Sequence, residues 1–500
     1  MKYDYLIIGS GLGGLALGII LAKENKKVLI LEQHYKPGGY LHSFSRKGNQ
    51  FETGFHFAPE LDSDQILNMY WGYLGILDKI DLLKYNPQNF HTLIFPDFKL
   101  ELPSGIDNIR QVVKGKFPSE SQKIDTYFDK LKELKTYFTF FNRDHKGDMD
   151  KEHKSFELTL TDFFNQLNIS AELRAVLSAH SFLYGVPPKN APLGTHAIFS
   201  NAVYSSAYDI EGGGDALINA LVQSFKENGG EILLRKEVRE ITMNDKIATG
   251  VICNDDTHYE ADNLVSAINP QTTIDLFKEN PFRSVYSSRI KEMPNTSSHF
   301  GLYALIDDPS LDTVKHDTLF FPDYNIDSMY DNPISGNDKG HFLYTTIPTA
   351  RLGKKDNFHI IETLSIDNWN NYSKWSNTRF GKRPEDYKEF KESSCQKVID
   401  QLQSIFKLKK ENISFYEGST PLTNYHFTKS PSGSMYGIQH NIDQMRAPIR
   451  ARTKVPNLFL TGQSLIFPGI VGVTITSFVT ACEMFGMEYV FNKIDGLSNN

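Results

Sequence analysis

The sequence predicts an α/β fold of two domains, one Rossmann-like and one of mixed α+β type. Residues 1–39 alternate a short apolar strand, a glycine-rich loop, an apolar helix and a second strand. Short strands and glycine loops return in residues 205–270 and 450–490, and the stretches between them are mainly helical or mixed. A chain of 500 residues with 40% hydrophobic content is long enough for such a division, because domains usually contain about 100 to 200 residues.

The N-terminal strand is the apolar run from Asp4 to Ile8, and a loop containing Gly9, Gly11, Gly13 and Gly14 follows it. Leu15–Ala22 predicts the helix, and Val28–Leu31 predicts the next strand, which ends at Glu32. This order has the spacing of a dinucleotide-binding βαβ unit.

Each part of that unit has a physical role. Gly9 permits the tight turn, Gly11 lets the backbone approach a pyrophosphate, and Gly14 lets the helix pack closely on the strand. The phosphates would meet unpaired N–H groups and the positive end of the helix. Glu32 is placed to accept hydrogen bonds from a ribose diol and disfavours a 2′-phosphate, so the expected nucleotide is FAD or NAD rather than NADP.

A second glycine turn favours FAD. Pro37-Gly38-Gly39 follows Glu32 closely and predicts another tight approach of the backbone to the cofactor. An acid followed by a Gly-Gly turn resembles the extended fingerprint of FAD-dependent oxidoreductases of the amine oxidase and phytoene desaturase superfamily.

The run Phe51-Glu52-Thr53-Gly54-Phe55-His56-Phe57 makes the resemblance more specific. It is similar to the F-D-T-G-x-H segment of the branch that contains all-trans-retinol 13,14-reductases, carotenoid isomerases and bacterial phytoene desaturases. Glu52 stands where an aspartate is usual in that branch. Alternating aromatics around a glycine predict a strand or strand end close to a ligand. His56 is the candidate catalytic residue, and the alternative is a structural histidine.

The same branch is matched later in the chain by Thr420–Thr423, by Gly433–Gly437 and by Pro456–Gln463. The resemblance implies that Val238 holds the adenine through its backbone. It also implies that a helix starting near Gly472 directs its positive end at the flavin ring. Gln463 stands where many relatives have an acid.

The resemblance implies a flavoprotein with a discontinuous FAD-binding domain (1–60, 205–270 and 450–490) and a substrate-binding domain (61–204 and 271–449). The predicted cofactor-binding residues are Gly9, Gly11, Leu12, Gly13, Gly14, Glu32, Gln33, Gly38, Gly39, Val238, Gly462, Gln463, Gly472 and Val473.

The implied function is an FAD-dependent oxidoreductase or isomerase that saturates, desaturates or isomerises C=C bonds of a long apolar polyene such as a carotenoid or retinoid. The electron donor stays open. Two alternatives remain: an amine oxidase-like flavoenzyme, and a non-catalytic isoprenoid carrier similar to the Rab GDP-dissociation inhibitors.

The charge and the cysteine content of the chain indicate which classes of partner and cofactor are not expected. The net charge is −7 and no long basic run occurs, so no nucleic-acid partner is expected. Cys253, Cys395 and Cys482 are far apart and form neither a disulfide framework nor a metal-binding pattern, so no metal is expected and a reducing cytoplasm fits.

Three stretches bear on membranes. Glycines interrupt Tyr5–Ala22, which argues against a signal peptide. Leu465–Cys482 has no charge, but proline, glycine, serine and threonine dilute it, so a buried helix is favoured over a transmembrane one. An apolar stripe from Ile124 to Phe141 beside lysines predicts a helix packed on a core, with a membrane-surface helix as the alternative. A cytoplasmic protein is expected, with peripheral membrane contact left open.

Overall fold

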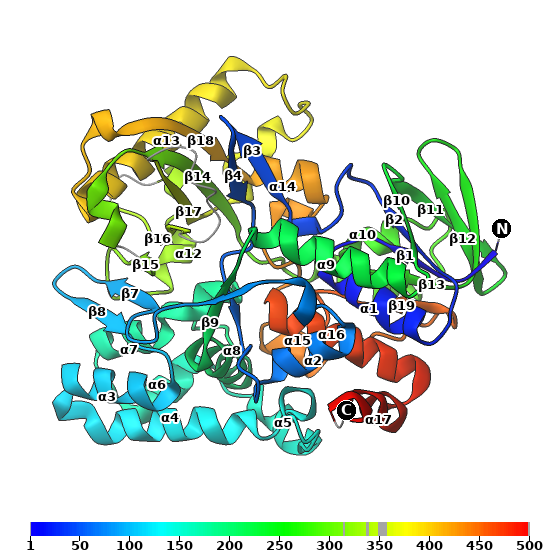
Figure 1. The fold of residues 1–500 in the computed structure, drawn as a ribbon, viewed down its shortest axis with the longest axis horizontal. Coiled ribbons are helices and arrows are strands. Elements are labelled where there is room, and N and C mark those ends of the chain that lie inside the picture. The colour runs from blue at the N-terminus through cyan, green and yellow to red at the C-terminus, as the bar shows by residue number, and fades with distance from the viewer. Residues whose placement is uncertain (1, 314–315, 337–339, 349–357, 499–500) are drawn as a thin grey trace.

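The computed structural model describes residues 2–313, 316–336, 340–348 and 358–498. The two large sheets lie in opposite halves of the molecule; α1 (Leu12–Lys23), α9 (Gly213–Glu227) and α16 (Gly469–Phe485) lie beside and below the first sheet, and the helices of residues 106–205 lie below the second (Figure 1). The α/β class predicted from the sequence is confirmed.

The first sheet has the strand order β10-β2-β1-β13-β12-β11, and β19 also pairs with β13. Strands β10, β2, β1, β13 and β19 are parallel, and β12 and β11 extend the sheet as antiparallel strands. Every residue of β2 is buried, as expected for a parallel strand covered on both faces. The strands are β1 (Lys2–Ile8), β2 (Val28–Glu32), β10 (Glu231–Leu234), β11 (Val238–Asn244), β12 (Ile247–Cys253), β13 (His258–Ser266) and β19 (Leu458–Leu460).

Helix α1 (Leu12–Lys23) lies at the centre of this half and packs against α9 (Gly213–Glu227) and α16 (Gly469–Phe485). Its residues from Leu12 to Ala22 are all buried, so it has no polar face. A Cβ at Gly14 would lie 2.1 Å from the carbonyl oxygen of Gly9, which shows how closely the helix approaches the end of β1. The predicted strand–helix–strand unit is therefore present.

The second sheet has the order β18-β14-β17-β16-β15-β7-β8. Its long strands are β14 (Ser298–Ile306) and β17 (His359–Asp367), and every residue of β14 is buried. Helix α13 (Glu385–Phe406) contributes Cys395, Val398 and Leu402 to the apolar cluster beneath β14. The other strands are β7 (His91–Ile94), β8 (Lys99–Leu102), β15 (Asp317–Phe320), β16 (Leu343–Thr346) and β18 (Ile413–Ser419).

Residues 61–204 are mainly helical, as predicted, but they also contribute the hairpin β7–β8 to the second sheet. Each strand of this hairpin has only four residues, which is too short for a period-2 pattern to be recognised, although β8 alternates exposed and buried residues. The helices of this stretch are α2 (Ile66–Leu74), α3 (Ile106–Lys116), α4 (Ser121–Lys135), α5 (Met149–Ser155), α6 (Leu160–Leu167), α7 (Ala171–Ser178) and α8 (Leu193–Ser205).

Helix α4 packs its apolar stripe into the core, as predicted from the spacing. Ile124, Phe128 and Leu131 are fully buried. Four of its lysines form ion pairs with nearby carboxylates, at 2.6 Å for Lys132 with Asp107 and at 2.9 Å for Lys135 with Glu60. With its apolar face covered and these lysines paired, α4 is a core helix rather than a membrane-surface helix.

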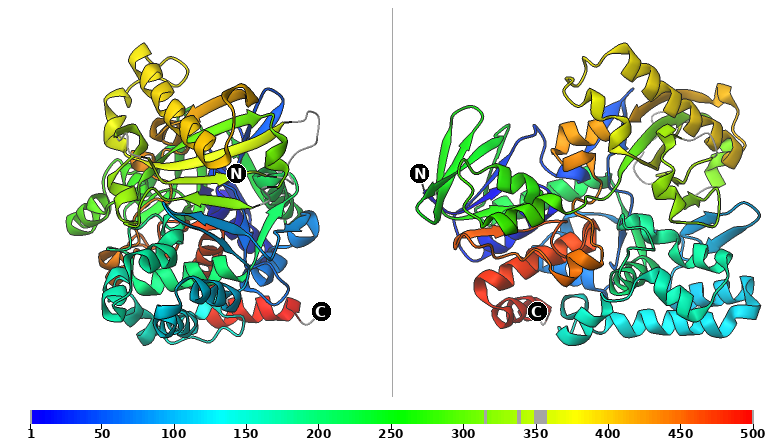
Figure 2. Two further views of the ribbon diagram at one scale, coloured as in Figure 1. Left: turned by 90° about the vertical axis from the view of Figure 1, so that its left-hand side faces the viewer. Right: turned by 180° about the vertical axis from the view of Figure 1, so that it is seen from behind.

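Helix α16 begins at Gly469, directly after Pro468, three positions before the Gly472 start expected from the sequence. Pro468 has no N–H group and an extended backbone, which suits the residue that precedes a first turn. In the part of the chain that the structure describes, no helix combines the length and the apolarity needed to cross a membrane. Helix α17 (Met487–Ser498) packs beside α16 and α2 at the C-terminus (Figure 2).

The structure contains further short strands and helices. They are β3 (Ser43–Arg46), β4 (Asn49–Glu52), β5 (Ala58–Pro59), β6 (Leu82–Lys84), β9 (Ala207–Ile210), α10 (Pro270–Asp275), α11 (Ser284–Glu292), α12 (Ser328–Asp331), α14 (Pro421–Thr428) and α15 (Ile442–Arg446). The division into two domains stays a prediction, and residues 314–315, 337–339 and 349–357 of the predicted second domain lie outside the described residues.

Several buried histidines carry a prediction about stability. Burial lowers the pKa of His42 and His299 to about 4 and the pKa of His91, His196 and His440 to about 3. In the unfolded chain these groups titrate near pH 6.5, so below that pH the unfolded state binds more protons and stability falls. At pH 5 each group removes up to about 2 kcal/mol from a total that is commonly about 5–15 kcal/mol.

We therefore expect full stability above pH 6.5 and a steep loss between pH 6.5 and 4. Thermal unfolding at pH 7.5, 6.0 and 5.0 measures this. His440→Phe should flatten the pH dependence below pH 6.5, because it removes one such group. An unfolding temperature that stays constant from pH 7.5 to pH 5.0 would contradict the prediction.

Candidate functional site

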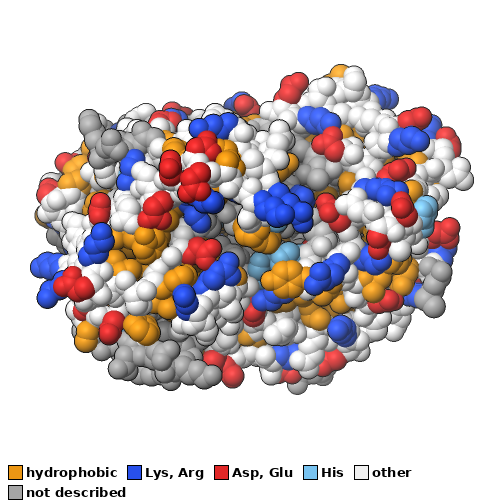
Figure 3. All heavy atoms as spheres, turned by 90° about the horizontal axis from the view of Figure 1, so that it is seen from above, with side chains coloured by type: hydrophobic (Ala, Val, Ile, Leu, Met, Phe, Trp, Pro, Cys, Tyr) orange, Lys and Arg blue, Asp and Glu red, His pale blue; other side chains and the backbone are white. Residues whose placement is uncertain are grey.

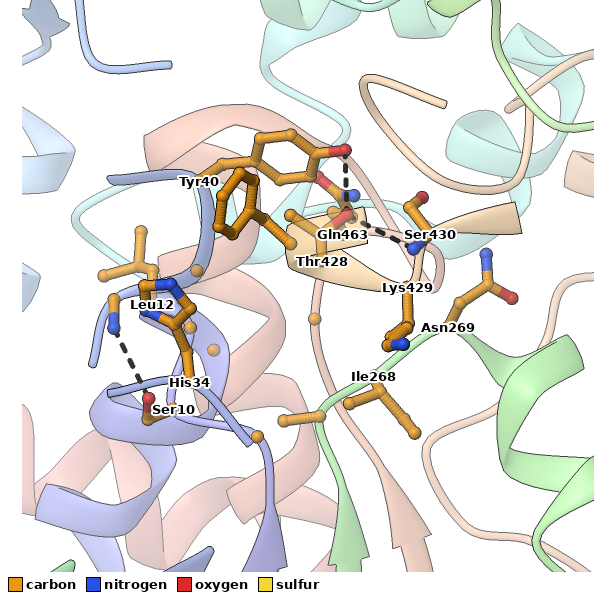
Figure 4. Close-up of a pocket in the computed structure, with 18 of the residues that line it drawn as sticks. Ser10, Leu12, His34, Tyr40, Ile268, Asn269, Thr428, Lys429, Ser430 and Gln463 are labelled. Carbon is orange, nitrogen blue, oxygen red and sulfur yellow. Dashed lines mark hydrogen bonds between the residues drawn. The ribbon is translucent and has the colours of Figure 1, made fainter. Parts of the chain in front are cut away.

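A cavity of about 730 Å³ lies between the first sheet and the second, and residues of both halves line it (Figure 4). The carboxyl ends of β1, β2, β13 and β19 open onto it through Gly9, Glu32, Ala267 and Thr461. In an open parallel sheet this edge is where ligands bind.

The N-terminus of α1 borders the cavity. Gly11 precedes the first turn, and a Cβ built on it would have no atom within 4 Å, so this position faces open space. The N–H groups of the first turn have no partner inside the helix and can bind an anion. A Cβ on Gly13 would approach the Cα of Gly462 to 3.0 Å, so the helix and the turn after β19 touch through backbone.

Glu32 is buried at the end of β2 and lines the cavity. Its Oε2 accepts hydrogen bonds from the N–H (2.9 Å) and the hydroxyl (2.6 Å) of Ser10, and its Oε1 accepts one from the N–H of His34 (2.8 Å). These bonds fix the carboxylate beside the glycine loop. A carboxylate offers about four acceptor positions, so one remains for a ribose hydroxyl.

The second glycine turn lies directly against the first. Gly38 donates a hydrogen bond to the carbonyl of Ser10 at 3.0 Å, and Gly11 and Gly38 form an isolated bridge. Gly38 has a φ of 115°, which a residue with a side chain rarely adopts. Gly38 and Gly39 both line the cavity, where the sequence placed them.

A strap formed by residues 425–434 crosses the cavity on the side facing these turns. Gln33, predicted to bind the cofactor, lines the cavity but donates its amide to the carbonyl of Phe427 at 3.2 Å. Tyr40 donates to the carbonyl of Ser434 at 2.8 Å and accepts from the hydroxyl of Thr428 at 3.3 Å (Figure 4). The strap thus joins the two halves over the cavity.

Val238, at the start of β11, lines the cavity together with Glu237 and Arg239. It is paired in the sheet with Cys253. Lys429 of the strap lies 3.9 Å from the carboxylate of Glu237, so an ion pair closes this part of the cavity.

Among the C-terminal residues, Gly462, Gln463 and Val473 line the cavity. Gly472 does not, because it packs on the backbone of Phe467, 2.5 Å from the position of a Cβ. Gly469, which was not predicted, lines the cavity at the start of α16. Likewise Gly14 packs on Gly9 and is absent from the lining.

His56 lies just beyond the end of β4, and its side chain lines the cavity with 12% of its surface exposed. Its Nδ1 lies 3.9 Å from Oε2 of Glu362, a carboxylate of β17 with 1% exposed surface. The ring of Tyr344 meets the imidazole edge-on with the ring centres 5.2 Å apart. The hydroxyl of Tyr85 donates to the carbonyl of His56 at 3.2 Å.

Four further polar side chains that line the cavity are uncharged at neutral pH. Burial lowers the pKa of His299 to about 4, and burial followed by the nearby His34 lowers the pKa of His42 to about 4. Burial raises the pKa of Tyr40 to about 12 and raises that of Tyr436 further. These four side chains add no charge to the cavity wall, and apolar residues such as Phe182, Leu183, Leu364, Met435 and Ile470 line it as well.

Sequence reasoning missed several of these residues. Tyr40 and His42 follow the predicted Gly38-Gly39 turn within three residues, so their place beside the turn could have predicted that they line the cavity. Phe182, Leu364 and His299 come from segments without a motif, and only the packing of the second sheet brings them to the cavity.

The sequence model of the family described as flavin containing amine oxidoreductase matches residues 12–300. The chain belongs to this family. Its cofactor is accordingly FAD, and it is a flavin-dependent oxidoreductase, as the glycine turns and Glu32 predicted.

Two curated relatives of this flavoenzyme lie in the branch predicted from the sequence. The chain is 27% identical in sequence to all-trans-retinol 13,14-reductase of Danio rerio, over 94% of this chain and 84% of that protein. It is 23% identical to prolycopene isomerase 2 of an Oncidium hybrid cultivar, over 94% of this chain and 81% of that protein. The solved structure of putrescine oxidase shares the fold, with a TM-score of 0.67, 14% identity and coverage of 97% of this chain and 100% of that chain.

The geometry fits FAD. Open space at Gly11 lies next to the first turn of α1, where a pyrophosphate needs backbone N–H groups. The fixed carboxylate of Glu32 and the backbone of Val238 line the same cavity, as a ribose and an adenine require. The lining continues past Gly39 and Gln463 to His56, so a cofactor bound at the glycine loop can reach the second sheet.

Proposed function

We propose that this flavoenzyme acts on C=C bonds of a long apolar polyene, such as a retinoid or a carotenoid, by saturation, desaturation or cis–trans isomerisation. Both curated relatives are named for reactions of polyenes. The observation that carries the proposal is the neutral, largely apolar and aromatic cavity wall contributed by the second sheet and its neighbours.

That wall suits a hydrocarbon chain. A charged amine or carboxylate would need a charged partner when it is desolvated, whereas a polyene only needs apolar and aromatic contacts. Among the described lining residues contributed by η5 (Ala179–Leu183), β14 and β17, none carries a carboxylate, an ammonium or a guanidinium group.

Bound FAD would give hydride or electrons to the substrate carbons in saturation, take them in desaturation, and exchange them transiently in isomerisation. The chain's own residues position the substrate, exclude water and manage the proton. We assign His56 the role of giving or taking the proton, because it is a titratable side chain at the junction of the cofactor side and the apolar wall. Glu362, 3.9 Å away, holds and orients the imidazole.

The test uses the purified, FAD-loaded enzyme. All-trans-retinol and a poly-cis carotene are incubated separately with the enzyme under reducing and under oxidising conditions, and the products are identified by mass and retention time. A gain of two hydrogens shows saturation, a loss of two shows desaturation, and an unchanged mass with a new retention time shows isomerisation. Conversion of putrescine or another amine with no conversion of either polyene would overturn the proposal in favour of an amine oxidase. Tight binding of a polyene without any conversion would favour a carrier.

A further inference from the structure

The rim of the cavity carries a surface that the proposed function does not explain. Two segments meet there, residues 369–384 and residues 420–435, and together they form what we call the basic aromatic patch. Their contact is direct, because the ring of Phe380 stacks on that of His426 at 4.9 Å and lies 5.0 Å from that of Phe427. The patch is defined by Lys374, Arg379, Phe380, Lys382, Tyr425 and His426, all of which are exposed.

The charge of the patch is one-sided. Neither segment contains an aspartate or a glutamate, although the whole chain has a net charge of −7. Within the described residues no carboxylate lies within ion-pair distance of Lys374, Arg379 or Lys382. The lysines of α4 differ in this respect, since four of them have an acidic partner.

The patch also exposes aromatic rings. Phe380 has 41% and Tyr425 has 38% of its surface exposed, and Tyr425 is held by the ring of Trp369 at 5.1 Å. Exposed rings beside unpaired cations are typical of surfaces that lie in the headgroup region of a bilayer. In Figure 3, which looks onto the side of α14 and β3, hydrophobic and histidine side chains near the centre are bordered by lysine and arginine side chains.

The position of the patch connects it to the site. Tyr425, Phe427 and Lys429 line the cavity while their neighbours Phe380 and Arg379 face outward. A surface that contacts the patch therefore also meets the mouth of the cavity.

We propose that the basic aromatic patch docks the enzyme on an anionic lipid bilayer, with the mouth of the cavity facing the membrane. The cations would meet lipid phosphate and carboxylate groups, and Phe380 and Tyr425 would enter the interface. The biological use of this docking rests on the proposed function, because a polyene substrate dissolves in lipid. The docking itself does not depend on the proposed function.

The test compares three forms of the FAD-loaded enzyme for binding to vesicles of phosphatidylcholine with and without phosphatidylserine. The patch variant combines Lys374→Gln, Arg379→Gln and Lys382→Gln. The matched control combines Lys26→Gln, Lys246→Gln and Lys278→Gln, three exposed lysines outside the patch that remove the same net charge. Near an anionic surface each cation contributes about 1 kcal/mol, or about fivefold in affinity, so the patch variant should bind on the order of 100-fold more weakly. The control should bind nearly as the wild type does.

Wild-type binding should require phosphatidylserine, weaken with added salt and weaken further with Phe380→Ser. Equal binding to both vesicle types, equal weakening of the patch and control variants, or no vesicle binding by the wild type would each overturn the proposal. Unchanged vesicle binding by the patch variant, with a raised KM for a reducing partner, would assign the patch to an acidic electron donor instead. Turnover of a detergent-dispersed polyene is measured in parallel, so that failure of the docking and failure of the proposed function are told apart.

Discussion

We expect Gly11→Val to yield a folded protein that is purified with little FAD. Gly11 has a φ of −62° and a ψ of 174°, which valine adopts without strain, and a Cβ there meets no atom within 4 Å. The new side chain therefore costs the fold little, but it occupies the space from which a pyrophosphate reaches the first turn of α1. Two charge-assisted hydrogen bonds of about 1.5–3 kcal/mol each are then lost, which weakens FAD binding by at least about 100-fold.

Absorbance of the purified variant near the flavin bands and its unfolding temperature without added FAD measure the two effects separately. Gly115→Val is the matched control, because Gly115 also has no atom within 4 Å of a Cβ but lies exposed on α3. It should keep its flavin. A Gly11→Val protein that retains FAD at full occupancy would refute the assignment of this loop.

We expect replacement of His56 to lower turnover of a polyene by about 10²- to 10⁴-fold, which is the usual contribution of a positioned proton donor or acceptor. His56→Gln keeps a side chain of similar size but removes the imidazole that can give or take a proton. His56→Ala removes both the size and the imidazole. Both variants should keep FAD, because His56 is not part of the glycine turns or of the strap. If both keep FAD and full turnover, His56 is structural and the reaction needs no proton from this position.

Glu362 is the residue expected to orient the imidazole of His56, and its replacement tests whether it does so or only stabilises the fold. Glu362→Gln keeps an acceptor for the N–H of Glu52, which lies 2.6 Å from Oε1, and replaces the carboxyl group that faces His56 by an amide. Turnover should fall by roughly tenfold in the wild-type background and no further in the His56→Gln background, because coupled residues are not additive. An equal loss in both backgrounds would assign Glu362 a structural role alone.

The sequence was most informative where local rules decide the structure. The βαβ unit and the short strands of residues 205–270 follow from apolar periodicity and glycine turns, and the structure has each of them. The hairpin β7–β8 was missed because its strands are short and are stabilised by pairing with the distant β15. Tertiary pairing of this kind leaves little trace in a local pattern.

The site divides in the same way. The glycine turns, Glu32, Val238 and Gln463, which the motifs predicted to bind the cofactor, line one cavity, and their contact with FAD stays a prediction. The start of α16 was misplaced because Pro468 and Gly469, rather than Gly472, set the first turn. Glu362 could not be linked to His56 from the sequence, since only the folding of β17 against β4 brings the carboxylate to the imidazole.

The first sheet imposes an order on the assembly of the protein during synthesis. Leu6 of β1 pairs with Leu264 of β13, and Leu264 pairs in turn with Leu458 of β19. The N-terminal glycine loop therefore leaves the ribosome long before the strand that brings Gly462 against it exists. Non-local parallel pairing forms slowly, and the nascent chain meanwhile exposes an unpaired strand edge. The flavin can be enclosed only after translation is nearly complete, so the supply of FAD and the protection of the waiting N-terminal half by chaperones should together limit the yield of active enzyme.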